Sequence, residues 1–182
     1  MNKNVNWGIL GCAGIARIRT IPGLLQADNA RLYAVASRGD GKAEGFKELF
    51  SAEKAYGSYE QLLEDDEVDA VYIPLPNSMH YEWTAKAAKA GKHILCEKPL
   101  AMNEEEARKM YEVCRENGVL LMEAFAYRHS PLVQKVKALI DEGAIGKVKY
   151  IESHLTDVLF DMSNIRMNQN LGGGAFYDIF VV

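Results

Sequence analysis

An acidic, a basic and a rigid residue follow one another at Glu97, Lys98 and Pro99. They come directly after residues 94–96, an apolar stretch that we expect to be a short buried strand. In open α/β sheets, ligands bind at the carboxyl ends of the strands. The segment therefore places an acid, an ammonium and a rigid turn where ligands bind, although a charged surface turn has the same composition.

A second candidate site lies near the start of the chain, where Gly11 opens the sequence Gly-Cys-Ala-Gly-Ile-Ala. The dinucleotide fingerprint G-x-G-x-x-G/A joins a strand to a helix whose N-terminus faces the pyrophosphate. Ala13 replaces the second glycine and adds a methyl group there, so a domain without a dinucleotide is the alternative. We expect the turn to bind a dinucleotide through Gly11, Cys12, Ala13, Gly14, Ile15 and Ala16.

The end of the second predicted strand indicates which dinucleotide binds. An acidic residue there would hold the ribose hydroxyls of NAD, but here the strand ends in Ser37 and Arg38. Arg38 can stack on adenine and pair with a 2′-phosphate, Ser37 can donate to that phosphate, and Lys42 adds positive charge. We therefore expect NADP rather than NAD. The alternative is a solvated Arg38, with Asp40 on the ribose.

The loop after the third strong strand completes the predicted cofactor set. It runs from Pro74 to His80, and its two prolines stiffen it. Asn77 or Ser78 can cap the following helix. His80 could bond near the ribose or satisfy the packing of its own helix, and the packing role is the better supported of the two. From this loop we expect contacts with the cofactor through Pro74, Leu75, Asn77 and His80.

These sites require a framework of alternating strands and helices. Apolar runs predict strands over residues 5–11, 31–37, 69–75, 94–96 and 119–125. Helical periodicity and capping residues predict helices over residues 14–26, 41–51, 78–90, 104–117 and 131–142, with a short helix after Ser58. Such alternation predicts an α/β fold with a Rossmann-type, doubly wound parallel sheet. Residues 147–156 look like one long strand that begins a second domain.

Composition limits the function classes. The net charge of −4 gives no reason to expect nucleic-acid binding. No apolar run is long enough to span a bilayer, and the N-terminal residues lack the apolar core of a signal peptide. Three cysteines without metal-like spacing are typical of reduced thiols, so we expect a cytoplasmic protein without a metal site.

Several motifs together resemble the Gfo/Idh/MocA oxidoreductase family. The matching pieces are residues 7–16, 74–80, 90–99, 123–128 and 172–178, in the order in which the family has them. The Glu-Lys-Pro element and the late Gly-Gly-Gly-x-x-x-Asp element are more specific than the glycine turn. The Ala13-type turn and the Ser37–Arg38 pair look most like the sugar and dihydrodiol dehydrogenase branch, which uses NADP.

The resemblance implies roles for individual residues. Lys98 would point at the substrate hydroxyl that becomes a carbonyl, and Asp178 would contact the same oxygen. Glu97 would lie near the nicotinamide end of the cofactor, and Pro99 would be cis. Arg128 would lie beside the cleft, with a surface ion pair as an equal alternative. The implied activity is hydride transfer between NADP and a sugar, polyol or diol.

The end of the printed sequence departs from the family pattern. The family continues as Asp-x-Gly-x-Tyr or Asp-x-Gly-x-His, but here Phe180 and Val182 occupy those positions. We expect a dinucleotide-binding domain over residues 1–125 and an incomplete second α+β domain over residues 126–182, cut short by truncation. Such a chain is expected to bind NADP, to turn over poorly and to self-associate as a homo-oligomer. A non-catalytic NADP-binding module or regulator is the alternative.

Overall fold

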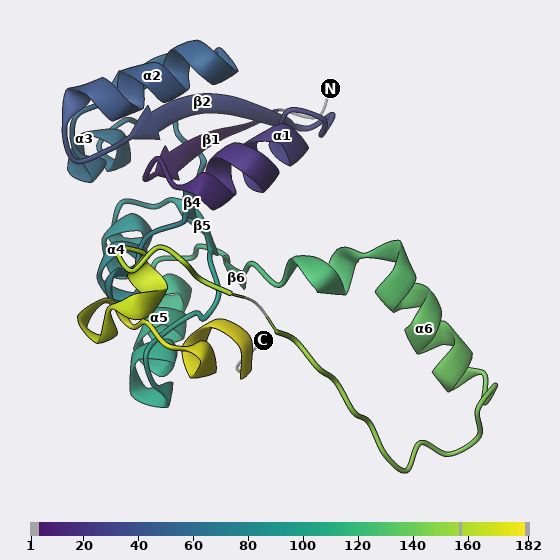
Figure 1. The fold of residues 1–182 in the computed structure, drawn as a ribbon. Helices are drawn as coiled ribbons and strands as arrows, with labels where there is room; N and C mark the ends of the chain where they lie inside the picture. Colours follow the sequence, from purple (N-terminus) through teal and green to yellow (C-terminus); the bar gives the residue numbers. More distant parts are fainter. Residues whose placement is uncertain (1–3, 157, 181–182) are drawn as a thin grey trace.

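The protein is built on a six-stranded parallel sheet with the strand order β3-β2-β1-β4-β5-β6 (Figure 1). The structure is a computed structural model that describes residues 4–156 and 158–180. The strands are β1 (Val5–Leu10), β2 (Ala30–Ala36), β3 (Lys54–Tyr56), β4 (Ala70–Ile73), β5 (His93–Cys96) and β6 (Leu121–Glu123). Every pairing is parallel, so the predicted Rossmann-type α/β fold is confirmed.

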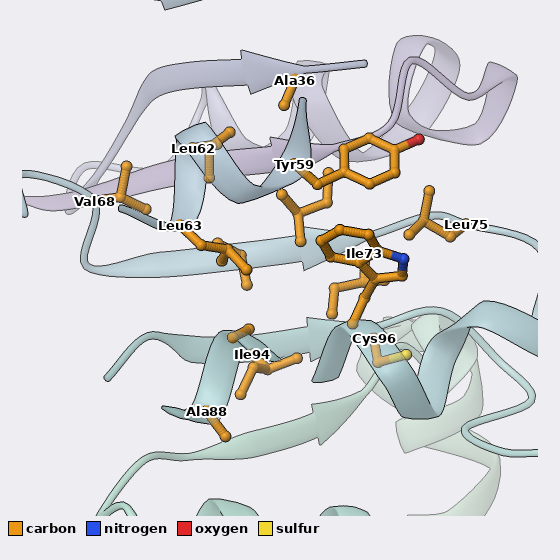
Figure 2. Close-up of a cluster of buried hydrophobic side chains, with 14 of the residues drawn as sticks. Ala36, Tyr59, Leu62, Leu63, Val68, Ile73, Leu75, Ala88, Ile94 and Cys96 are labelled. Carbon is orange, nitrogen blue, oxygen red and sulfur yellow. The ribbon is translucent and has the colours of Figure 1, made fainter. Parts of the chain in front are cut away.

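Helices cover both faces of this sheet because successive strand residues point to opposite sides. Ile9 and Tyr72 belong to the core under η1 (Ala16–Thr20), α1 (Ile21–Leu24) and α2 (Asp40–Phe50). Leu10 and Ile73 belong to the larger core under α3 (Tyr59–Leu63), α4 (His80–Lys89) and α5 (Glu104–Glu116) (Figure 2). These strands are buried on both faces, which explains their nearly continuous apolar sequences.

Capping residues place the helices where the sequence predicts them. The Ser58 side chain accepts a hydrogen bond from the Gln61 amide at 3.3 Å at the start of α3. The Asn103 side chain accepts one from the Glu106 amide at 2.9 Å at the start of α5. Pro22 lies near the start of α1, directly after η1, and the helical segment ends at Leu24, two residues later, as expected for a proline within a helix.

Two strand predictions fail. The three-residue strand β3 was not expected, because Lys54–Tyr56 is too short and too polar to show a strand period. Conversely, residues 147–156 form no strand and are almost entirely exposed. A strand is stable only when another strand pairs with it, and the described part of the sheet ends at β6 on this side. Residues 147–156 therefore have a sequence that favours a strand but no neighbouring strand with which to pair.

The last third of the chain leaves the sheet and then returns to it. After η3 (Ala126–His129), helix α6 (Pro131–Asp141) projects from the body, and the chain comes back beside α4 and α5 (Figure 1). The returning part contains η4 (Ile165–Met167), η5 (Gln169–Leu171) and η6 (Phe176–Phe180). The Asn77 side-chain amide donates to the Gly172 carbonyl at 2.8 Å, and the Tyr177 hydroxyl donates to the Met102 carbonyl at 3.3 Å. Val182, the predicted departure from the family pattern, lies outside the described residues.

Candidate active site

Lys98 lies in the turn that leaves the carboxyl end of β5, and the Lys98–Pro99 peptide bond is cis. Its Nζ donates to the Asp178 carbonyl at 2.6 Å and to Asp178 Oδ1 at 2.9 Å. The two side chains are only 24% and 27% exposed, so the pair is partly screened from water. The two residues predicted to be catalytic are therefore in direct contact, although 80 positions separate them.

Arg166 completes this charged group. Its Nε donates to Asp178 Oδ2 at 2.7 Å, so each carboxylate oxygen has its own cationic partner. Burial acts to raise the pKa of Asp178, but the hydrogen bonds from Arg166 and Lys98 outweigh it and hold that pKa below 3.8. Asp178 is therefore an anion at neutral pH, held in one orientation by two cations.

Glu97 is oriented from the sheet. The Tyr72 hydroxyl, from the middle of the core, donates to Glu97 Oε1 at 2.5 Å. Burial and then the Glu97 charge raise the pKa of Tyr72 well above its ordinary value, so the phenol remains a protonated donor. The Lys98 amide donates to Glu97 Oε2 at 3.3 Å. Glu97 is thereby fixed beside the backbone of Lys98.

The glycine turn lies at the carboxyl end of β1, beside the loop that follows β4. Gly11 has a φ of +120°, and a β-carbon there would lie 2.9 Å from Leu75 Cδ2, so only glycine fits. Gly14 opens the first helix, and a β-carbon there would meet nothing within 4 Å. The turn thus packs inward on Leu75 and leaves its helix N-terminus open on the outside.

The residues predicted to select NADP gather beside this turn. Arg38 is exposed and faces the hydroxyl of Tyr59, and Figure 2 shows that hydroxyl on the side where the strands end. The Cys12 thiol lies 3.5 Å from the Lys42 carbonyl, and its burial raises the pKa of Cys12 to about 11. Ser37 differs from the prediction: it is buried, and its hydroxyl donates to the Gly39 carbonyl at 2.5 Å. Its single proton is directed at Gly39, so donation to a phosphate would require the hydroxyl to rotate away from that carbonyl.

His80 is completely buried and has a structural role. Its Nδ1 lies 2.8 Å from the Pro99 carbonyl, and its Nε2 lies 2.8 Å from the Leu75 carbonyl. Each ring nitrogen therefore faces a backbone carbonyl, and a neutral ring donates to one of the two. This geometry favours the packing alternative over the predicted cofactor contact of His80.

Arg128 lies at the opposite edge of the sheet from the NADP-selecting residues. It follows β6, while the glycine turn follows β1, and β4 and β5 lie between the two strands. Arg128 lines an open hollow together with Phe125 and Gln134. The structure gives no contact that ties Arg128 to the glycine turn.

Among the described residues, no three His, Cys, Asp or Glu side chains gather as a metal site requires.

Three residues of this site escaped sequence reasoning. Tyr72, Tyr59 and Arg166 contact predicted residues but belong to none of the matching motifs. The one available signal was a tyrosine, Tyr72, within an otherwise aliphatic buried strand. A buried tyrosine hydroxyl usually has a hydrogen-bond partner, and that partner lies 25 positions further along the chain.

The fold and the site define a class of protein. The strand order changes direction between β1 and β4, and the glycine turn lies at this switch point. A parallel sheet of this kind defines a dinucleotide-binding domain of the Rossmann type. Residues 5–125 match the sequence model of an oxidoreductase family with an NAD-binding Rossmann fold, and residues 133–181 match the GFO/IDH/MocA C-terminal domain. The chain therefore belongs to the GFO/IDH/MocA family of oxidoreductases.

Two similar relatives are named for reactions of sugars. The chain is 42% identical over 174 residues to a dTDP-3,4-didehydro-2,6-dideoxy-α-D-glucose 3-reductase from Actinomadura kijaniata, covering 96% of this chain and 52% of that protein. It is 41% identical over 174 residues to D-xylose 1-dehydrogenase (NADP(+)) 2 from Haloferax volcanii, covering 95% and 53%. The chain thus spans about half the length of the curated relatives it matches.

A solved structure supports the same assignment. The chain superimposes on a mutant 3-ketoreductase from Actinomadura kijaniata in complex with TDP-benzene and NADP, with a TM-score of 0.76 and 43% identity. The superposition covers 80% of this chain and 45% of that one.

In the described part of the present chain, no helix is long and apolar enough to cross a membrane.

Proposed function

We propose that this chain is the NADP(H)-binding, lysine-bearing part of an oxidoreductase that transfers hydride between the nicotinamide and a hydroxyl or carbonyl carbon of a sugar, polyol or diol. The observation that carries the proposal is the pairing of Lys98 with Asp178 at the carboxyl end of β5. The sugar-active relatives and the NADP-bound neighbour support the substrate and cofactor classes.

The cofactor site fits a dinucleotide with a 2′-phosphate. The open N-terminus of the first helix at Gly14 suits the pyrophosphate, because the first N–H groups of a helix have no partners within the helix. Arg38 and Lys42 supply positive charge near the end of β2, where the adenosine ribose lies in such folds. When bound, NADP would supply or accept the hydride.

Lys98 has the donors needed for the accompanying proton transfer. An ammonium has three N–H groups, and two of those of Lys98 are used on Asp178. The third remains for a substrate oxygen, where it can stabilise developing negative charge and deliver or receive a proton. Asp178, held anionic by Arg166, keeps the ammonium in place.

Cofactor titration tests the proposal directly. We expect NADPH to bind the purified chain with an increase in nicotinamide fluorescence, and more tightly than NADH. NADPH should also protect Cys12 from maleimide, since Cys96 and Cys114 are buried and Cys12 is the partly accessible thiol. Absence of both binding and protection would overturn the cofactor assignment.

A Lys98→Met variant separates an enzyme from a non-catalytic NADP-binding module. If the chain, alone or extended at its carboxyl end, oxidises sugars or diols, the variant should bind NADPH normally and lose turnover by about 10²–10⁴-fold. Equal turnover by the parent and the variant would contradict the role of Lys98.

The free cysteines further support a proposed cytoplasmic location.

A further inference from the structure

The peptide unit that follows Pro99 is held at one end by a buried histidine and at the other by a half-buried glutamate. Its carbonyl, on Pro99, lies 2.8 Å from Nδ1 of His80, and its N–H, on Leu100, donates to Glu123 Oε1 at 2.7 Å. In a trans peptide the C=O and N–H point in opposite directions. His80 in α4 and Glu123 in β6 therefore hold the same plane from opposite sides.

Lys98 precedes this peptide by one residue, so the plane sets the direction in which the lysine side chain leaves the backbone. The turn is held at its other end too, because the Glu97 amide donates to the Ile73 carbonyl at 3.1 Å. With its proton on Nδ1, the neutral His80 ring donates to the Pro99 carbonyl, while its Nε2 lies 2.8 Å from the Leu75 carbonyl. Leu75 packs on Gly11 of the cofactor turn.

Burial makes these two contacts specific. His80 is 0% exposed, and burial raises the pKa of Glu123 above its ordinary value. A buried polar atom that loses its partner has no water to replace it. Loss of the His80 contact leaves the Pro99 carbonyl without its buried partner, and loss of the Glu123 contact removes the only acceptor that the described part of the structure gives the Leu100 N–H. Either loss should loosen the peptide plane.

We propose that His80 and Glu123 are positioning residues for Lys98, which fix the Pro99–Leu100 peptide and thereby keep the ammonium on Asp178. This inference rests on the proposed function for its catalytic meaning, but the geometric claim can be tested without cofactor. A histidine inside α4 and a glutamate at the end of β6 thus acquire a role that no motif assigned to them.

Acylation of lysines, followed residue by residue with mass spectrometry, tests the proposal on the full chain. Lys98 should react slowly in the parent because it is paired with Asp178. In His80→Gln and Glu123→Ala its reaction should accelerate about two- to fivefold, the range expected for loss of a partly exposed ion pair. Asp178→Asn should show the same increase, as a positive control.

Conservative variants provide the matched controls. The amide nitrogen of asparagine can occupy the position of Nδ1, so His80→Asn should keep the hydrogen bond to the Pro99 carbonyl. Lys98 should therefore be acylated as slowly in His80→Asn as in the parent, unlike in His80→Gln. Glu123→Gln keeps an acceptor for the Leu100 amide and should also label slowly. Lys92, 5% exposed and bonded to the Asp65 carbonyl at 2.7 Å, reports any general loosening of the fold.

The outcomes are distinct. Parent-like labelling of Lys98 in both disruptive variants would overturn the proposal, as would equal acceleration in the conservative ones. Exposure of Lys92 in both disruptive variants would show that His80 and Glu123 serve general folding instead, which also overturns it. Failure of NADPH to bind the parent would overturn only the proposed function, because Lys98 labelling is measured without cofactor.

Discussion

Single residues at this site act through partners that are distant in sequence. Lys98 depends on Asp178, Glu97 on Tyr72, and Asp178 on Arg166. Each pair joins residues that only the folded chain brings together. Hydrogen bonds with a charged partner are worth roughly 1.5–3 kcal/mol, so single substitutions should have measurable effects.

Arg38 should determine the choice of cofactor. Arg38→Ala should weaken NADPH binding by about 10- to 150-fold, the loss expected from one charge-assisted hydrogen-bonding partner. NADH, which lacks the 2′-phosphate, should bind the variant as it binds the parent. Fluorescence titrations with both cofactors measure this difference, and a parallel loss of NADH affinity would place Arg38 on the adenine or ribose instead.

Tyr72→Phe should destabilise the protein because it leaves the carboxylate of Glu97 without its buried donor. The expected loss is about 1–3 kcal/mol in the free energy of unfolding, measured with urea. Tyr111→Phe is the matched control, since the side chain of Tyr111 is 61% exposed and its change should be close to zero. Equal effects in the two variants would contradict the role assigned to the Tyr72 hydroxyl.

At the scale of elements, the returning segment with η4, η5 and η6 carries Asp178 to the sheet. Its approach depends on Gly172, which has a φ of +77°. A β-carbon there would lie 2.5 Å from Met102 Sδ and 2.8 Å from Asn77 Cβ. The glycine therefore serves both the turn and the close packing of this segment on the loops that precede α4 and α5.

Gly172→Ala should release the returning segment, and Gly143→Ala should not. Gly143 has nearly the same φ, +76°, but a β-carbon there would meet nothing within 4 Å. Both variants carry the strain of a left-handed residue, roughly 1–2 kcal/mol, and only Gly172→Ala adds the clash. Hydrogen exchange of residues 164–178 should accelerate in Gly172→Ala alone, and equal acceleration in both would refute the packing argument.

At the scale of the whole molecule, His80 should make stability depend on pH. Burial lowers the pKa of His80 below 6.5, despite the two carbonyls beside it. Between the two values the unfolded chain binds more protons, so stability should fall as pH decreases below about 6.5. Glu123 acts in the opposite sense at lower pH, because its raised pKa means that the folded chain binds more protons.

The contribution of His80 is isolated by comparison with His80→Asn, which cannot titrate. Urea unfolding at pH 7.5 and at pH 5.5 should show a larger loss of stability in the parent than in the variant. An identical change in the two proteins would mean that His80 retains its ordinary pKa.

The region after β6 exposes an unusual amount of apolar surface. Along α6, Leu132, Val136 and Leu139 form one exposed stripe, and further along the chain Ile151 is 79% and Phe160 is 90% exposed. Large contiguous apolar patches are uncommon on monomers. We therefore expect this chain to self-associate through residues 131–160.

Sedimentation at several concentrations tests this expectation. The mean mass should rise with concentration in the parent and stay near 20.3 kDa, the mass of one chain, in an Ile151→Lys, Phe160→Lys double variant. Tyr111→Lys changes an exposed ring on α5 and should leave the association intact. A parent that remains monomeric at all concentrations would contradict the prediction.

The sequence by itself determined the alternation of strands and helices, the glycine turn and the place of Lys98 at the end of a strand. These follow from local rules: buried parallel strands are nearly continuous apolar runs, and helices begin at capping residues such as Asn103. Only the tertiary structure decided that residues 147–156 form no strand and that Ser37 is buried. It alone paired Lys98 with Asp178 and placed His80 and Glu123 on one peptide, because such contacts depend on how distant segments pack.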